Sequence, residues 1–187
     1  MSAPNSPALF DSAYRMPITP WGDVRIPPEL KELLKTAKPK SSLELGCGLG
    51  RFSRFVAQQG VAATAVDFSP VAIEKAIARA KDDAAPPRYL VGDVTKLEAL
   101  SGPFDIAFDV GCFHCLDVAQ ERAYAAEMAR LISPGGTLLI WALDESPSDL
   151  RLDGEAVRRV FTEFELMSAK SSRRRVIASH WYRLVRR

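Results

Sequence analysis

The feature that most constrains this chain is the stretch SLELGCGLGRF at residues 42–52, in which Gly46, Gly48 and Gly50 alternate with other residues. The apolar run before the glycines predicts a buried strand, and the residues after them predict the start of a helix. Glycine lets the backbone turn tightly and approach a ligand closely, and the amides that open a helix face such a ligand. We therefore interpret the stretch as a cofactor-binding turn between a strand and a helix. A tight turn without a ligand is the alternative.

The residues around the glycines separate two kinds of cofactor site. The dinucleotide fingerprint G-x-G-x-x-G requires its third glycine where this chain has Arg51. Glu44 instead precedes Gly46 by two residues, in the order E-x-G-x-G-x-G. The pattern therefore departs from the phosphate-binding form, and a nicotinamide-dependent oxidoreductase is the last of the alternatives.

Strand-like and helix-like segments alternate along most of the chain. We expect strands at 43–47, 61–68, 88–94, 104–112, 137–142, 164–168 and 177–185, and helices at 27–37, 50–59 and 153–161. Two more helices are predicted to begin at Ser69-Pro70 and at Asp117, where Gln120 completes a capping box. The first of these is expected to bury Ile73, Ile77 and Ala80. This alternation predicts an α/β fold with a doubly wound sheet, a ligand at the carboxyl ends of its strands, and an antiparallel pair at one edge.

Acidic residues stand at the ends of the second and third expected strands. Asp67 follows the first glycine of the turn at the distance where a carboxylate can accept hydrogen bonds from both hydroxyls of a ribose. Asp93 can accept from an adenine amino group while the amide of Val94 donates to the ring. An acid in the turn before a helix is the alternative for Asp67. The spacing favours a nucleotide-type cofactor.

Size and composition fit one soluble domain. The chain has 187 residues, of which 47% are hydrophobic and 26% are charged. It begins without the basic and apolar regions of a signal peptide, and no apolar stretch is long enough to span a bilayer, so we expect a cytoplasmic protein without membrane contact. Residues 1–12 are expected to be disordered because Pro, Ser, Ala and Asn dominate them. We expect 1–26 to be a flexible cover of the active site and 27–187 to be a single domain, monomeric or homodimeric.

Charge and cysteine content limit the kinds of macromolecule and metal that the chain is expected to bind. Residues 151–187 contain ten Lys and Arg but four Asp and Glu residues. Such a region binds nucleic acid or acidic substrates, or forms the solvated edge of a sheet; we favour the edge and expect no nucleic-acid partner. Three cysteines, Cys47, Cys112 and Cys115, form no disulfide framework. Without a second ligand pair for zinc, no metal is expected.

Taken in order, these motifs resemble those of the class I S-adenosylmethionine-dependent methyltransferases over about residues 25–187. The shared features are the acid–glycine turn, Asp67, Gly92-Asp93, the segment at 109–116 and Pro134-Gly135-Gly136. The resemblance implies a Rossmann-like, seven-stranded, mostly parallel sheet of order 3-2-1-4-5-7-6 with an antiparallel seventh strand, and S-adenosylmethionine as cofactor. It places Asp67 on the ribose, Asp93 and Val94 on the adenine, and Glu44 with Gly46 near the methionine part. Cys47, Gly48, Gly50, Phe68, Asp109 and Val110 are expected to complete the cofactor site.

Two short stretches, residues 18–30 and 109–116, are similar to the small-molecule branch that includes thiopurine and thiol methyltransferases. The Asn/Asp-Pro-Pro-aromatic motif of amino-methylating DNA enzymes would fall at 109–112, where this chain has Asp-Val-Gly-Cys. This departure argues against DNA adenine methylation. The resemblance therefore implies methyl transfer to S, O or N of a small molecule, which the few insertions in the chain suggest is flat and apolar.

The chemistry of methyl transfer sets the roles of the remaining candidates. The reaction needs alignment and exclusion of water, because the cofactor's sulfonium already carries the positive charge. A thiolate acceptor needs no base, whereas a hydroxyl or ring N–H benefits from one. His114 is the candidate base, with a pocket-lining role as the alternative, and Trp21 can cover the sulfonium with its ring face. The acceptor pocket is expected to contain Tyr14, Trp21, Cys112, Phe113, His114 and Trp141, with a core position on its strand as the alternative for Trp141.

Two other functions stay open from the sequence. The first keeps the cofactor but methylates a macromolecule, tRNA or protein, and the basic carboxyl-terminal region supports it weakly. The second is a cofactor-binding relative of the same fold without activity. The presence of all four expected cofactor positions argues against the second.

Overall fold

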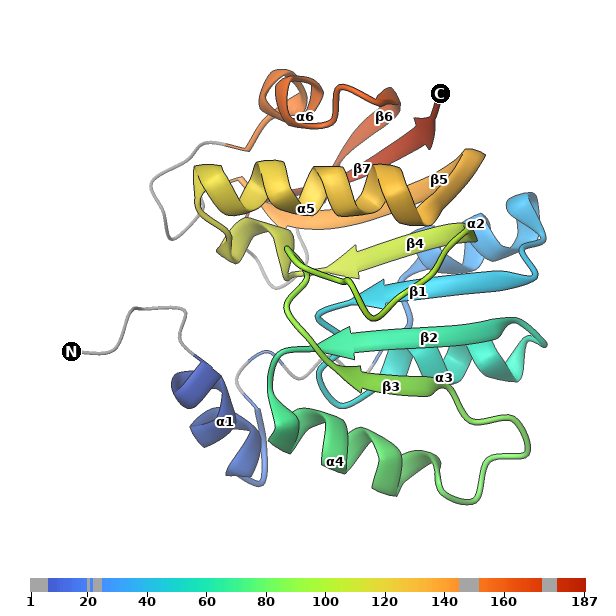
Figure 1. Cartoon of the computed structure of the whole chain (residues 1–187), viewed down its shortest axis with the longest axis vertical. Coiled ribbons are helices and arrows are strands. Elements are labelled where there is room, and N and C mark those ends of the chain that lie inside the picture. The colour runs from blue at the N-terminus through green and yellow to red at the C-terminus, as the bar shows by residue number, and fades with distance from the viewer. Residues whose placement is uncertain (1–6, 20, 22–24, 145–151, 173–177) are drawn as a thin grey trace.

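The computed structural model describes residues 7–19, 21, 25–144, 152–172 and 178–187. Its centre is a seven-stranded sheet of order β3-β2-β1-β4-β5-β7-β6 (Figure 1). The strands are β1 (Ser41–Leu45), β2 (Ala62–Asp67), β3 (Arg88–Val91), β4 (Phe104–Val110), β5 (Ile132–Leu143), β6 (Phe164–Ser172) and β7 (Ser179–Arg186). The first five pair in parallel, and β7 runs antiparallel to both β5 and β6. The predicted order and the antiparallel seventh strand are confirmed.

Helices cover both faces of this sheet (Figure 1). They are α1 (Pro7–Arg15), α2 (Pro28–Ala37), α3 (Arg51–Gln58), α4 (Pro70–Ala80), the short 3₁₀ helix η1 (Phe113–Cys115), α5 (Val118–Leu131) and α6 (Gly154–Val160). One apolar core joins α2 and α3 to the sheet, with Leu30 and Val56 fully buried. A second core joins α5 and α6 to the other face, with Met128 and Phe161 at its centre. The sheet is therefore the middle of three layers.

The central strand β4 shows how the sequence fills both cores. Ile106 and Phe108 belong to the core under α2 and α3, whereas Ala107 belongs to the core under α5. Successive side chains of a strand point to opposite faces, and a parallel strand covered on both faces reads as a nearly continuous apolar run. Asp109 interrupts this run at the carboxyl end of the strand, where the functional turn begins.

Helix α1 corrects the expectation that residues 1–12 are disordered, because residues 7–15 are helical. The segment is rich in residues typical of turns, but it also contains two aromatic residues, Phe10 and Tyr14, that share a helix face at i and i+4 spacing. The Tyr14 ring is buried, and its carbonyl oxygen accepts a hydrogen bond from Nζ of Lys75 on α4 at 2.6 Å. The hydroxyl of Ser69 donates a short hydrogen bond to the Asp11 carboxylate. These tertiary contacts outweigh the weak helix propensity.

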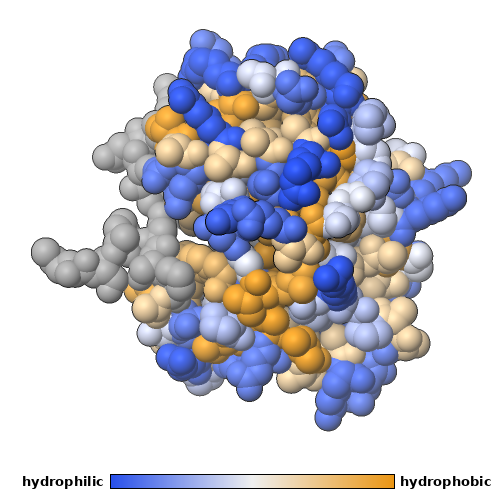
Figure 2. Space-filling view, in the orientation of Figure 1, coloured by the Kyte–Doolittle hydropathy of each residue, from blue (hydrophilic) through white to orange (hydrophobic). Residues whose placement is uncertain are grey.

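Ile77 was expected in the core but is 52% exposed. The buried face of α4 runs through Ala72, Ile73, Ala76 and Ala80, and residue 77 is rotated by about 100° from residue 76. The neighbouring edge strand β3 is too short to cover the flank of the helix. Figure 2 shows apolar side chains gathered near this edge, where Val91 is also exposed.

Several strand boundaries differ from the expected ones: β6 extends to Ser172 rather than to 168, β4 ends at Val110 rather than at 112, and β3 and β5 differ as well. β3 ends at Val91, short of residue 94, because the Asp93 carboxylate accepts hydrogen bonds from the amide and hydroxyl of Thr95 at 2.8 and 2.7 Å and starts a turn. β5 begins at Ile132 rather than at 137, with residues 133–136 forming an irregularity in its pairing with β4. The capping box at the start of α5 is confirmed.

The carboxyl-terminal strands form an antiparallel pair at one edge of the sheet, as predicted. The basic run at 173–175, which carries part of the charge of this region, lies outside the described residues. In the part of the chain that the structure describes, no helix is both long and apolar enough to cross a membrane.

Candidate active site

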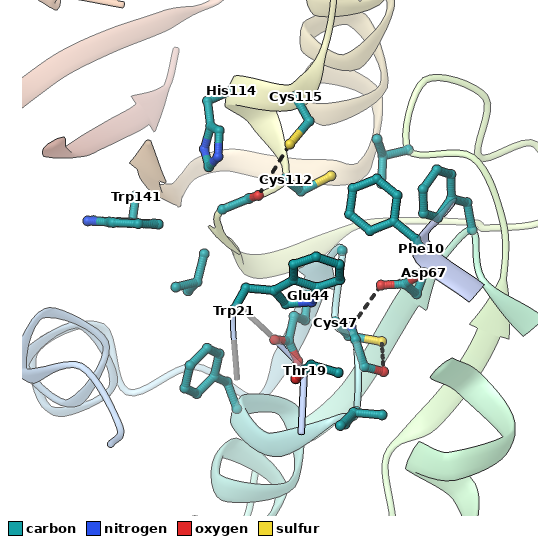
Figure 3. A pocket seen from close by; sticks show the side chains of 18 of the residues that line it. Phe10, Thr19, Trp21, Glu44, Cys47, Asp67, Cys112, His114, Cys115 and Trp141 are labelled. Carbon is teal, nitrogen blue, oxygen red and sulfur yellow. Dashed lines mark hydrogen bonds between the residues drawn. The ribbon is translucent and has the colours of Figure 1, made fainter. Parts of the chain in front are cut away.

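A cavity of about 540 Å³ opens at the carboxyl ends of the parallel strands. It lies between β1 and β4, where the strand order of the sheet reverses, which is the usual ligand site of doubly wound folds. Figure 3 shows Glu44 and Asp67 on one side of this cavity, His114 and Trp141 on the other, and Trp21 between the two groups in this view. Four strands that are separated in sequence therefore contribute to one site.

The glycine turn is closely packed by its protein neighbours. Gly46 and Gly48 have φ angles of +65° and +51°, in the left-handed region that disfavours side chains. A Cβ atom on Gly46 would lie 2.5 Å from Cβ of Cys112, and one on Gly48 would lie 2.9 Å from the hydroxyl oxygen of Tyr14. The absence of side chains thus lets the segment after β4 and helix α1 close on the turn.

Gly46→Ala tests this close approach, with Gly60→Ala as its matched control. Gly60 also has a positive φ, +82°, but a Cβ there meets nothing within 4 Å. Both variants carry the left-handed penalty of about 1–2 kcal/mol, and Gly46→Ala adds about 1–3 kcal/mol for overpacking. We expect its melting temperature, followed by circular dichroism, to fall about 2–12 °C below that of the control. Equal melting temperatures would contradict the packing described.

Glu44 is a buried carboxyl group at the floor of the cavity. Its Oε2 atom accepts a hydrogen bond from the amide of Ser53, in the first turn of α3, at 2.8 Å. Burial raises the pKa of Glu44 to about 8, and the charges of Asp67 and Asp109 add to the effect. The carboxyl group therefore carries a proton at neutral pH when no cation lies beside it. A ligand cation next to it would favour the charged form.

Asp67 connects the glycine turn to the next helix. Its carboxylate accepts hydrogen bonds from the amides of Gly48 and Ser69, at 2.8 and 2.9 Å. Burial raises the pKa of Asp67, while these two hydrogen bonds oppose the rise. Because a carboxylate has about four acceptor positions, it can hold the backbone and still accept from a diol in the cavity. Asp93 and Val94 line the β3 side of the same cavity.

The opposite wall is neutral and aromatic. The ring of His114 is 8% exposed and meets the ring of Trp141 edge-on, with centroids 5.9 Å apart. Burial lowers the pKa of His114 to about 4, so its imidazole is uncharged at pH 7. Burial also raises the pKa of Cys115 to about 11 and that of Cys112 well above its ordinary value. Both thiols therefore stay protonated and serve as soft apolar surface.

Aromatic residues from the N-terminal segment cover the cavity. The indole N–H of Trp21 donates to the hydroxyl of Tyr14 at 3.2 Å, and the two rings meet edge-on. Phe10 lies 5.1 Å from Trp21 and 5.1 Å from Phe68, measured between ring centroids. All four rings line the cavity. Phe10 is not among the predicted site residues, because the composition of its segment predicts disorder; the i, i+4 spacing to Tyr14 is the sequence signal for it.

Three predicted site residues lie behind the cavity walls rather than on them. Phe113 is fully buried between the rings of Tyr124 and Phe161, each at 5.3 Å, so it belongs to the core and not to the acceptor wall. Asp109 is fully buried and binds backbone amides of the following turn. Gly50 is also absent from the described cavity wall. A place at a strand end or in the glycine turn therefore does not by itself put a residue on the cavity wall.

The other predicted residues do meet in the cavity. They are Tyr14, Trp21, Glu44, Gly46, Cys47, Gly48, Asp67, Phe68, Asp93, Val94, Val110, Cys112, His114 and Trp141. Further wall residues, besides Phe10 and Cys115, were not predicted: Thr19, Leu49, Arg51, Phe52, Arg79, Gly111, Leu116, Gln120 and Leu143. Arg51 and Phe52 follow the glycine turn directly, and this adjacency was the signal for them. Leu49 lies in the same turn, Gly111 and Leu116 lie in the segment at 109–116, and Leu143 ends β5. Thr19, Arg79 and Gln120 come from the N-terminal segment, α4 and α5, and their approach to the cavity depends on tertiary packing.

Comparison with known proteins identifies the family. Residues 43–136, half of the chain, match the family described as methyltransferase domain. The 2-heptyl-1-hydroxyquinolin-4(1H)-one methyltransferase of Mycobacteroides abscessus is 24% identical over 155 residues, covering 78% of this chain and 68% of the relative. An uncharacterized methyltransferase of Schizosaccharomyces pombe is 27% identical over 104 residues, covering 56% of this chain and 72% of the relative.

Solved structures share the fold over nearly the whole chain. The 1,6-didemethyltoxoflavin-N1-methyltransferase of Burkholderia thailandensis, with bound 1,6-didemethyltoxoflavin and S-adenosylhomocysteine, superposes with a TM-score of 0.80 at 19% identity, covering 100% of this chain and 93% of that chain. A structure from work on conversion of a disulfide bond into a thioacetal group during echinomycin biosynthesis gives a TM-score of 0.82 at 24% identity, covering 95% and 90%.

The chain belongs to the family of methyltransferase domains. The predicted class, a class I S-adenosylmethionine-dependent methyltransferase, is thereby confirmed. The narrower likeness to thiopurine and thiol methyltransferases stays a prediction.

Proposed function

We propose that the protein transfers the methyl group of S-adenosylmethionine to a sulfur, oxygen or nitrogen atom of a small, flat, apolar molecule, aromatic or heterocyclic. One observation carries the proposal: a single cavity joins a half with buried carboxyl groups to a half that is neutral and aromatic. The relatives from M. abscessus and B. thailandensis are named for small heterocyclic acceptors. Their names support the same acceptor class here.

The carboxyl-bearing half fits the cofactor. Glu44, whose pKa burial raises to about 8, suits the ammonium group of the methionine part, because a neighbouring cation favours the charged carboxylate. Asp67 keeps acceptor positions for the ribose, and Asp93 with Val94 faces the adenine. When bound, the cofactor supplies an activated methyl group on a sulfonium. Trp21 closes the cavity above it and excludes water.

The neutral half fits the acceptor. A flat ring can pack against Trp141 and the thiols of Cys112 and Cys115, none of which is charged at neutral pH. The neutral imidazole of His114 can accept a hydrogen bond from an acceptor's O–H or N–H and take its proton as the methyl group arrives. An acceptor with a permanent charge would lose its hydration here without a compensating partner, which favours neutral molecules.

Transfer of label from methyl-tritiated S-adenosylmethionine tests the proposal. The panel contains thiophenol, a phenol, a 1-hydroxyquinolin-4-one, bulk tRNA and denatured protein. We expect label in one or more of the small aromatic compounds and none in the macromolecules. Label found in tRNA or protein alone would replace the proposal with the macromolecular alternative. If the cofactor binds but no label is transferred to any compound, even after the panel is widened to further metabolites, the protein is a non-catalytic relative.

Glu44 makes a pH-dependent prediction for cofactor binding. Its pKa of about 8 in the free protein falls when the ligand ammonium arrives, so binding at pH 7 should release about one proton. The affinity for S-adenosylhomocysteine, which carries the same ammonium, should therefore increase as the pH rises from 6 to 8. Calorimetry at pH 7 in phosphate and in Tris should give binding enthalpies that differ by the ionisation enthalpies of the buffers. Glu44→Gln should abolish this difference, and equal enthalpies for the wild type would contradict the assignment.

A further inference from the structure

We propose that Asp109 and Tyr124 are a positioning pair, which fixes the turn that carries Cys112 and His114 into the acceptor half of the cavity. The inference rests on the proposed function, because it takes His114 as part of the acceptor site. Neither member of the pair lines the cavity, so both act through the turn.

The backbone of this turn is held by the Asp109 carboxylate. β4 ends at Val110, and Gly111 follows with a φ of +100°, which reverses the chain. Oδ1 of Asp109 accepts a hydrogen bond from the amide of Cys112 at 2.8 Å, and Oδ2 accepts one from the amide of Phe113 at 3.0 Å. The carboxylate thus caps the first amides of η1, as an N-cap residue does for a longer helix. The positions of residues 112–115 depend on it.

Tyr124 ties the same carboxylate to helix α5. Its hydroxyl donates to Oδ2 of Asp109 at 3.1 Å, and the side chain is fully buried. Its ring packs on Phe113 with a centroid distance of 5.3 Å. The helix therefore contacts the turn twice, through a hydrogen bond to the cap and through the ring of a turn residue.

The far side of the turn is fixed to β5. The amide of Gly111 donates to the carbonyl oxygen of Trp141 at 3.1 Å, and the ring of His114 meets the ring of Trp141. With one side held by β5, the orientation of His114 is set by the attachment on the other side. That attachment is the Asp109–Tyr124 pair.

The charge on Asp109 controls how many donors it can hold. Burial raises its pKa to about 7, opposed by the hydrogen bonds from the turn amides and Tyr124. The titratable groups that face it are Glu44 from β1, Cys112 and Cys115 from the turn, and Tyr124 from α5. Above pH 7 the ionised group accepts from all its donors. As the pH falls through 7, a proton occupies one acceptor position and the cap weakens.

Histidine NMR tests the pair without any ligand. The chain has two histidines, so isotope-labelled histidine gives one set of ring signals for His114 and one for His180, assigned with His180→Gln. His114 stays neutral above pH 5 because its own pKa is about 4. We expect its signal nevertheless to shift with a midpoint near pH 7, where Asp109 titrates.

Two matched variants identify the source of that midpoint. Tyr124→Phe removes a donor to the ionised carboxylate, so the His114 midpoint should rise by about one pH unit. Tyr182→Phe removes an equally buried hydroxyl, which donates to the carbonyl of Leu152 at 3.0 Å, and should leave the His114 midpoint unchanged. Methyl transfer to the best acceptor of the panel should lose about tenfold in kcat/KM in Tyr124→Phe, with S-adenosylhomocysteine affinity within twofold of wild type.

The outcomes separate this inference from the proposed function. A flat His114 signal between pH 6 and 8 in the wild type would overturn the positioning pair, as would an unchanged midpoint in folded Tyr124→Phe. If Tyr124→Phe does not fold, the pH titration of the His114 signal in the wild type decides whether the positioning pair holds. Failure to bind S-adenosylhomocysteine would contradict the proposed function but would not affect the evidence that the titration gives for the positioning pair.

Discussion

Asp67→Ala is expected to weaken the binding of S-adenosylhomocysteine by about 100-fold. The carboxylate supplies the acceptors for the ribose hydroxyls in the proposed complex, and hydrogen bonds to a charged group contribute about 1.5–3 kcal/mol each. The variant also frees the amides of Gly48 and Ser69, which the carboxylate holds at 2.8 and 2.9 Å. Calorimetric titration measures the loss.

Asp105→Ala separates the loss of a ligand contact from the loss of a backbone cap. Asp105 also accepts two backbone amides, those of Lys40 at 2.6 Å and Ser41 at 3.1 Å, but at the opposite end of the sheet. Its replacement should lower the melting temperature without changing affinity. Equal affinity losses in the two variants would show that Asp67 acts through stability and not on the ligand.

His114→Gln is expected to lower the rate of methyl transfer to a hydroxyl or N–H acceptor by about 100-fold. Glutamine keeps a hydrogen-bonding side chain but cannot take the proton. General bases contribute about 10²–10⁴-fold, and the low end applies because burial lowers the pKa of His114 to about 4 and makes it a weak base. The loss should appear in kcat under saturating cofactor.

The other histidine provides the control for this variant. His180 pairs with Asp144 at 2.6 Å and lies outside the described cavity wall, so His180→Gln should keep wild-type kcat. A thiol acceptor that is already ionised should also lose little in His114→Gln, because it brings no proton. Unchanged transfer to hydroxyl and N–H acceptors would reduce His114 to a wall residue.

The resemblance to class I methyltransferases predicted the strand order, and local sequence predicted which residues lie at the cofactor half of the site. The acid–glycine turn, the acid at the end of β2 and the Asp93-Val94 pair lie next to strands whose apolar runs are unmistakable, so their meeting at one edge follows from the topology. Glu44 and Asp67 therefore reached the cavity as predicted.

Other parts of the molecule depend on contacts that no local pattern encodes. The helix at residues 7–15 forms because Phe10 packs against the ring of Phe68 and Tyr14 packs against the ring of Trp21. Phe113 turns into the core and Asp109 turns onto the backbone because η1 reverses the chain directly after β4. A strand end shows which residues are near a ligand site, but the following turn decides which side chains enter it.

Calorimetric titration of the wild-type protein with S-adenosylhomocysteine, with NADH as the control ligand, tests the central claim most directly. We predict one binding site for S-adenosylhomocysteine, micromolar or tighter, proton release that depends on Glu44, and no heat from NADH. A folded protein that binds neither S-adenosylhomocysteine nor S-adenosylmethionine would contradict the assignment of this cavity as the cofactor site.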